Sequence, residues 1–145
     1  MRTHAALAVL PLVALTGCGG GGLSKKELVA KGDAICKRVN TRMAKEPDPK
    51  TAADLERLAK RTVAISDPAI KDMEALEPPS ELESDFENFL ASLKRQRNRT
   101  KKIGEAAAEG DTAKVQQIGA DAQSAQQEYR RITGKIGFKQ CGGGV

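Results

Sequence analysis

Hydrophobic positions along the chain recur at helical spacing in stretches that are separated by proline and glycine breaks. The first stretch begins at Ser24, which with Glu27 forms a capping-box pattern, and Leu23 and Leu28 flank that pattern as a hydrophobic staple. It ends at the Pro-Asp-Pro sequence of residues 47–49. The pattern therefore predicts an amphipathic helix between these limits.

A second helical stretch begins at Thr51 and stops at the proline pair of residues 78 and 79. Its apolar positions keep the same phase through Pro68, which favours one kinked helix. The alternative is that Asp67 caps a new helix whose first residue is Pro68.

Two further helices follow the proline pair. Ser80 and Glu83 form another capping-box pattern, and Gly110 fits the position just after the end of that third helix. Asp111 then caps a fourth helix with the most regular apolar spacing in the chain. The positions of this fourth stripe are Val115, Ile118, Ala122, Ala125, Tyr129, Ile132 and Ile136.

The connections between these amphipathic helices are short, so we expect an all-α domain over residues 24–141, arranged as an antiparallel, up-down-up-down four-helix bundle. The full sequence of 145 residues leaves room for one such domain. With three Phe, one Tyr and no Trp, its core depends on aliphatic side chains, which favours helices over sheets. Residues 142–145 are expected to be a disordered tail.

The N-terminus has the pattern of an export signal. Arg2 precedes an apolar run from Ala5 to Leu15, which is too short to cross a hydrocarbon core of ~30 Å. The next residues, Leu15-Thr16-Gly17-Cys18, resemble the lipobox of bacterial membrane lipoproteins. This resemblance implies that residues 1–17 are removed as a signal peptide and that Cys18 carries a diacylglyceryl group. An ordinary signal peptide with a cysteine near its cleavage site is the alternative.

A lipidated Cys18 would attach the protein to the extracytoplasmic face of a bacterial membrane, since two acyl chains anchor stably. Residues 18–23 would then be the lipidated cysteine and a glycine-rich tether. The other two of the three cysteines, Cys36 and Cys141, form an even pair, and we expect a disulfide between them. Free thiols with a redox role and a two-cysteine metal site are the alternatives.

This disulfide conflicts with the simplest bundle. The start of the first helix and the end of the fourth share one end of the bundle, yet Cys36 lies roughly 18 Å along the first helix at 1.5 Å per residue. Either the first turns of that helix overhang the bundle, or the chain after Gly137 runs back to meet Cys36.

The mature part also resembles, loosely, a group of small exported helical proteins of unknown role. The shared motifs are a Gly-Asp-Ala-Ile-Cys stretch at residues 32–36, the prolines at 78 and 79, Gly110-Asp111, and a terminal Gly-Phe-x-x-Cys-Gly at residues 137–142. The resemblance implies the same disulfide and no particular activity.

Several chemistries lack the residues that they need. The only histidine is His4, inside the expected signal peptide, so catalytic triads and histidine-ligated metals are excluded from the mature chain. No glycine-rich phosphate loop or EF-hand spacing occurs. The acidic residues at 81–87 alternate as on a solvated helix face. We therefore expect no enzyme activity, no metal and no cofactor.

The formal net charge is +5, and basic residues concentrate in the third predicted helix. The cluster consists of Lys94, Arg95, Arg97, Arg99, Lys101 and Lys102. We hypothesise that it contacts an anionic cell-wall polymer or an acidic protein, the alternative being a solvated surface. Nucleic acid is not expected as a partner, because no aromatic residue is interleaved with these charges for stacking.

Gln96, Arg97 and Thr100 form a polar layer that interrupts the inward stripe of the third helix. They either line a small ligand pocket, or Arg97 extends its guanidinium to solvent. Two functions thus stay open: a surface-anchored interaction or structural module, and a ligand-binding or sensory lipoprotein with a pocket inside the bundle. A cavity of ~300 Å³ or more at this layer favours the second.

Overall fold

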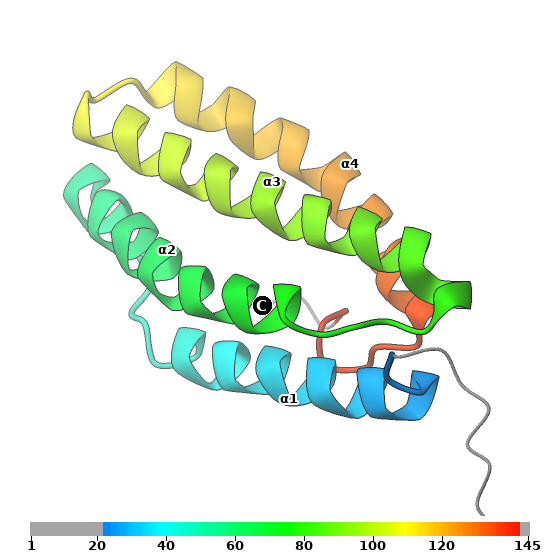
Figure 1. Ribbon diagram of the computed structural model, residues 1–145. Helices are drawn as coiled ribbons and strands as arrows, with labels where there is room; N and C mark the ends of the chain where they lie inside the picture. The colour runs from blue at the N-terminus through cyan, green and yellow to red at the C-terminus, as the bar shows by residue number, and fades with distance from the viewer. Residues whose placement is uncertain (1–21, 143–145) are drawn as a thin grey trace, which may run out of the picture.

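The computed structural model describes residues 22–142 and folds them into four α-helices, with no strand among these residues (Figure 1). This confirms the predicted all-helical fold. The helices are α1 (Lys25–Met43), α2 (Ala52–Glu74), α3 (Glu83–Ala108) and α4 (Thr112–Ile136), and a short 3₁₀ turn, η1 (Ser80–Leu82), precedes α3.

The first two helices begin where the sequence predicts. Ser24 caps α1, and the reciprocal hydrogen bonds with Glu27 complete a capping box. Thr51 caps α2 in the same way, with Asp54 as its partner. The second helix is continuous from Ala52 to Glu74 with Pro68 inside it, so the alternative of a split at Asp67 is wrong.

The start of α3 differs from the prediction. Ser80 does not cap the helix, because it is the first residue of η1, and Leu82 precedes α3 without any side-chain cap. The tighter 3₁₀ turn follows the proline pair and carries Leu82 into the core, where its side chain is 6% exposed. Packing of Leu82 thus takes precedence over local capping by Ser80.

The turn between α3 and α4 follows the predicted pattern. Gly110 has a φ of 70°, in the left-handed region that suits the position after a helix end. Its N–H donates to the carbonyl of Ala107, and the N–H of Asp111 donates to that of Ala106, which are the bonds of a Schellman motif. The Asp111 side chain then accepts from the N–H of Lys114 and caps α4.

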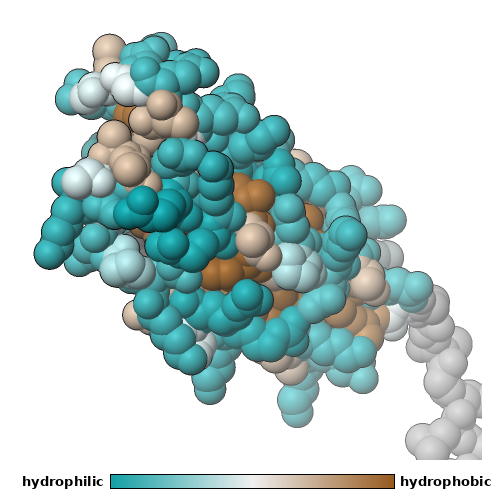
Figure 2. Space-filling view, turned by 90° about the vertical axis from the view of Figure 1, so that its left-hand side faces the viewer, coloured by the Kyte–Doolittle hydropathy of each residue, from teal (hydrophilic) through white to brown (hydrophobic). Residues whose placement is uncertain are grey.

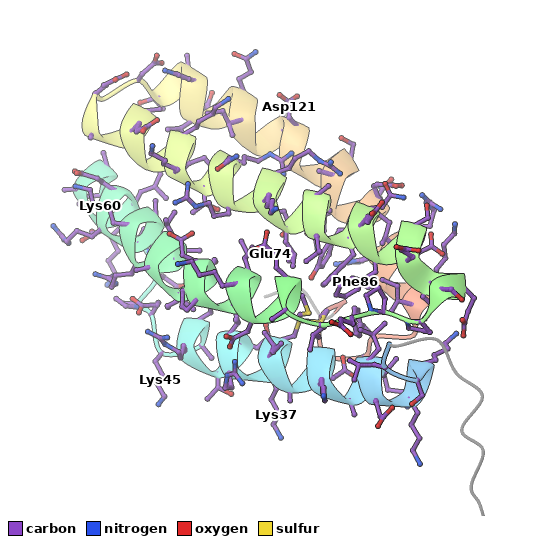
Figure 3. All side chains as sticks on the ribbon, viewed as in Figure 1. Lys37, Lys45, Lys60, Glu74, Phe86 and Asp121 are labelled. Atoms are coloured by element: carbon purple, nitrogen blue, oxygen red, sulfur yellow. A yellow bond between two sulfur atoms is a disulfide. The ribbon has the colours of Figure 1, made fainter. Side chains whose placement is uncertain are left out.

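The densest part of the core lies at one end of the molecule. Aromatic rings form its centre, with the Phe89 ring centroid 5.7 Å from that of Tyr129 and 5.0 Å from that of Phe138. Phe86, also in this cluster, points into the body of the molecule in Figure 3. In α4 only the second half of the predicted stripe is buried, from Tyr129 onwards, while the earlier positions are half-buried.

Consecutive helices pack against each other along their lengths. Within residues 22–142, extended packing joins α1 to α2, α2 to α3 and α3 to α4, whereas α1 and α4 share few contacts. The four helices therefore leave a gap between the first and the last.

The C-terminal segment lies in part of this gap, next to α1 (red and blue in Figure 1). Its backbone N–H groups at Lys139 and Gln140 donate to Asp33 Oδ1 over 2.9 and 2.8 Å. Cys141 then forms the predicted disulfide with Cys36, with an S–S distance of 2.06 Å. Of the two arrangements considered above, the segment after Gly137 runs back to Cys36.

Candidate functional site

A cavity of about 360 Å³ lies between the helices, beside the disulfide. All four helices and Cys141 contribute to its wall. It is partly open to solvent. Figure 2, which views the molecule from one end, shows hydrophobic residues between hydrophilic ones near the centre of the visible face.

One part of the cavity wall is apolar. Ile35 and Val39 of α1, Ile70 and Met73 of α2, and Leu93 of α3 contribute their aliphatic side chains. These residues surround the end of the cavity near the disulfide. This part of the wall suits an apolar ligand group.

The predicted polar layer forms another part of the same wall. Gln96, Arg97 and Thr100 of α3 line the cavity together with Thr62 and Ser66 of α2. The two threonines and the serine satisfy their hydroxyls by donating to backbone carbonyls one turn earlier. The Nε2 amide of Gln96 is buried without a hydrogen-bond partner among the described residues. A buried donor without a partner is costly, but this nitrogen has no accessible surface through which a ligand in the cavity could reach it.

Arg97 is held in place by an ion pair across the α2–α3 interface. Its Nε donates to Asp67 Oδ1 over 2.8 Å and its Nη2 donates to Asp67 Oδ2 over 3.0 Å. These hydrogen bonds lower the pKa of Asp67 and raise that of Arg97. The sequence pattern predicts Arg97 as part of the layer, whereas Asp67 has only the pattern of a possible helix cap.

The α4 side of the cavity supplies Gln126, Tyr129 and Arg130. Burial raises the pKa of Tyr129, whose hydroxyl makes no hydrogen bond to any residue between 22 and 142. Arg130 is exposed and forms no ion pair within the described chain. Sequence analysis placed Tyr129 in the core and did not identify Arg130 as part of a site.

The basic cluster of α3 is partly neutralised by neighbouring carboxylates. Lys94 Nζ lies 2.5 Å from an oxygen of Glu74, which is labelled in Figure 3 on α2. Lys101 lies 3.6 Å from Glu105, one turn later on its own helix. With Arg97 bound to Asp67, these pairs reduce the positive charge that the cluster offers to a partner.

The remaining members of the cluster are Arg95, Arg99 and Lys102, and none forms an ion pair with another described residue. Arg95 and Arg99 border a shallow groove towards α4, which also contains Asp121 and Glu128. The groove therefore mixes both signs of charge and does not form a purely basic surface.

Cys18 and the rest of the predicted lipobox lie outside the described residues. The described chain begins next to the connection between α2 and η1, where the N–H of Leu23 donates to the carbonyl of Glu77 over 2.8 Å. None of the described helices is long and apolar enough to cross a membrane.

No metal centre is formed by the described part of the chain. Between positions 22 and 142, no three or more His, Cys, Asp or Glu residues come together in a way that could hold a metal ion. The cavity wall itself has no carboxylate, and the sulfurs of its two cysteines are bonded to each other. Its chemistry is that of an apolar chamber with a few hydrogen-bond donors.

Comparison with protein-family models, with curated proteins and with solved structures finds no match for this chain.

Proposed function

We propose that this protein is a lipoprotein of a bacterial envelope, anchored through Cys18, that binds a small ligand in its interhelical cavity. The observation that carries the proposal is the cavity of about 360 Å³ at the layer of Gln96, Arg97 and Thr100. That volume lies within the range of ~300–1,000 Å³ typical of small-molecule sites. A binding role fits better than a catalytic one, because the wall offers no carboxylate, imidazole or free thiol.

The proposed arrangement of the helices is the antiparallel, up-down-up-down bundle. Two ion pairs across the α2–α3 interface support it: Lys94 binds Glu74, whereas Arg97, further along α3, binds Asp67, which is earlier in α2. In this arrangement the tether leaves the end of the molecule that contains Leu23 and η1.

Native mass spectrometry of the protein isolated from membranes tests the binding role. We expect the wild-type chain to retain a small molecule and the cavity-filling variant Ala69→Phe to lose it, because Ala69 lines the cavity. Ala64→Phe on the same helix is the matched control, since Ala64 is exposed and absent from the wall. If the wild type carries no molecule, or if all three chains carry the same one, the proposal fails.

The interaction role of the basic cluster is a weaker proposal. It depends on Arg95, Arg99 and Lys102, the members that no carboxylate of the described chain pairs with. Replacing Arg95, Arg99 and Lys102 by Gln should reduce retention on purified wall polymer at low salt. Unchanged retention would remove this role.

A further inference from the structure

The charge of the cavity wall and its unpaired donors indicate a ligand class. Arg97 and Arg130 are the charged members of the wall, and no carboxylate contributes to it. Arg97 is already bound to Asp67, so Arg130 is the cation that is free to bind a ligand. A cationic ligand would meet only like charge there, whereas an anionic group would find a partner.

Besides Arg130, another polar group of the wall can donate to a ligand. Tyr129 lines the cavity, and its hydroxyl makes no hydrogen bond to any residue between 22 and 142, so it has a hydrogen to donate. A carboxylate offers two oxygens that accept several hydrogen bonds, and guanidinium groups such as that of Arg130 bind carboxylates through paired bonds.

The shape and lining of the cavity favour an aliphatic body for the ligand. Along α1 the wall extends from Ile35 to Met43, which is about 12 Å at the helical rise of 1.5 Å per residue. Ile70, Met73 and Leu93 add aliphatic side chains to one part of this length. Tyr129 is the aromatic residue of the wall, and its ring already packs against Phe89, which leaves no ring pair to enclose a flat ligand.

We propose that the cavity binds an aliphatic monocarboxylate of the fatty-acid class, with its carboxylate at Arg130 and its chain among Ile35, Met73 and Leu93. This inference rests on the binding role proposed above. Arg130 is exposed and lines the same cavity as these aliphatic side chains, which allows the head group to stay near water while the chain is buried.

The chain contains its own reporter for the test, because it has one tyrosine and no tryptophan, and that tyrosine is Tyr129 in the cavity wall. The full chain in phosphatidylcholine vesicles is titrated with decanoate, decanol and decyltrimethylammonium while tyrosine emission is recorded. Decanoate should change the emission saturably and at lower concentration than the other two probes. The Ala69→Phe variant is titrated in the same vesicles. Its emission change reports the effect of probe dissolved in the lipid and is subtracted from that of the wild type.

Arg130→Gln should weaken decanoate binding roughly tenfold and leave decanol unchanged, because a charge-assisted hydrogen bond is lost. Arg131→Gln is the matched control: Arg131 is the next residue, is exposed, and pairs with Glu128 outside the cavity wall. Equal weakening by both substitutions would overturn the assignment of Arg130.

The outcomes separate this inference from the binding role. If decanol or the ammonium probe binds as well as decanoate, the carboxylate class is wrong while the binding role stands. If none of the three changes the emission, the fatty-acid class is wrong, and mass spectrometry of the isolated protein still decides the binding role. If mass spectrometry finds no retained molecule, the binding role proposed above fails, and decanoate binding through Arg130 would then show only that the cavity accepts this class of molecule.

Discussion

Gly32 has a specific packing reason to be a glycine. A Cβ built on it would lie 2.4 Å from Cε1 and 2.7 Å from Cζ of Phe138. The Phe138 ring is 6% exposed and packs against Phe89, so it has little room to retreat. The glycine in the middle of α1 thus allows the C-terminal segment to lie directly against the helix.

We predict that Gly32→Ala lowers the free energy of unfolding by about 1–3 kcal/mol, the usual cost of overpacking a core. Gly134→Ala is the control, because Gly134 lies inside α4 with nothing within 4 Å of its Cβ position. Alanine there should stabilise the helix by up to ~1 kcal/mol. Urea unfolding measures the free energy of unfolding of both variants. If Gly32→Ala leaves it unchanged, Phe138 is not tightly held.

The ion pair between Asp67 and Arg97 predicts a pH dependence of stability. The pKa of Asp67 is lowered in the folded chain, so its contribution is fully present above its unfolded pKa of ~3.9 and is lost as the pH falls through the folded value. Because the Asp67 side chain is 45% exposed, the contribution is small.

Asp67→Asn should therefore be less stable than wild type at pH 7 and equal to it near pH 2. Urea unfolding at both values measures the difference. If the difference in the free energy of unfolding is the same at the lower pH, the substitution acts through packing and not through charge.

At the scale of single helices, local patterns predicted most of the helix starts. Ser24, Thr51 and Asp111 each cap the helix that their own sequence neighbourhood predicts, because capping is a contact between residues three apart. Ser80 has the same local pattern and does not cap. Whether Ser80 caps the helix depends on the packing of Leu82 in the core. That core is built by residues distant in the sequence, so a local pattern cannot show it.

The fourth helix shows the same limit for burial. Its apolar stripe is equally regular in both halves, yet the residues that become buried all lie from Tyr129 onwards. Periodicity identifies the side of a helix that faces the protein, but the neighbours that cover it come from other elements. Here α1 does not extend its packing to α4, and the early part of the stripe remains half-exposed.

We predict that backbone amides of residues 112–125 exchange with solvent faster than those of residues 129–136. Regions with few buried apolar contacts open at lower free energy than a packed core. Hydrogen exchange followed by mass spectrometry of peptides from α4 measures this. Uniform protection along the helix would indicate that its first half is covered by a partner or a second copy of the chain.

At the scale of the whole molecule, sequence analysis located part of the candidate site and missed the rest. Gln96, Arg97 and Thr100 were identified because they interrupt an apolar stripe within one helix. Arg130 and Asn40 were not, since their place on the cavity wall depends on the gap between α1 and α4. The C-terminal segment lies against α1 through contacts between residues about a hundred positions apart.

The disulfide holds this long-range contact. It joins residues separated by 105 positions, and the chain-entropy model gives a loop of this size about 4–5 kcal/mol of stabilisation. We predict that replacing Cys36 and Cys141 together by Ser lowers the free energy of unfolding by up to that amount and weakens decanoate binding, because Cys141 lines the cavity. Urea unfolding and Tyr129 emission measure the two effects, and full retention of both would contradict this role.

Attachment to the membrane gives the most direct test of the N-terminal prediction. A diacylglyceryl group on Cys18 would add mass to the isolated polypeptide and hold it in the membrane fraction. Cys18→Ser should abolish both effects while circular dichroism of the helices stays the same, since Cys18 lies outside the described fold. A wild-type chain with the mass of its unmodified residues, recovered from the medium, would instead favour an ordinary signal peptide and a free protein.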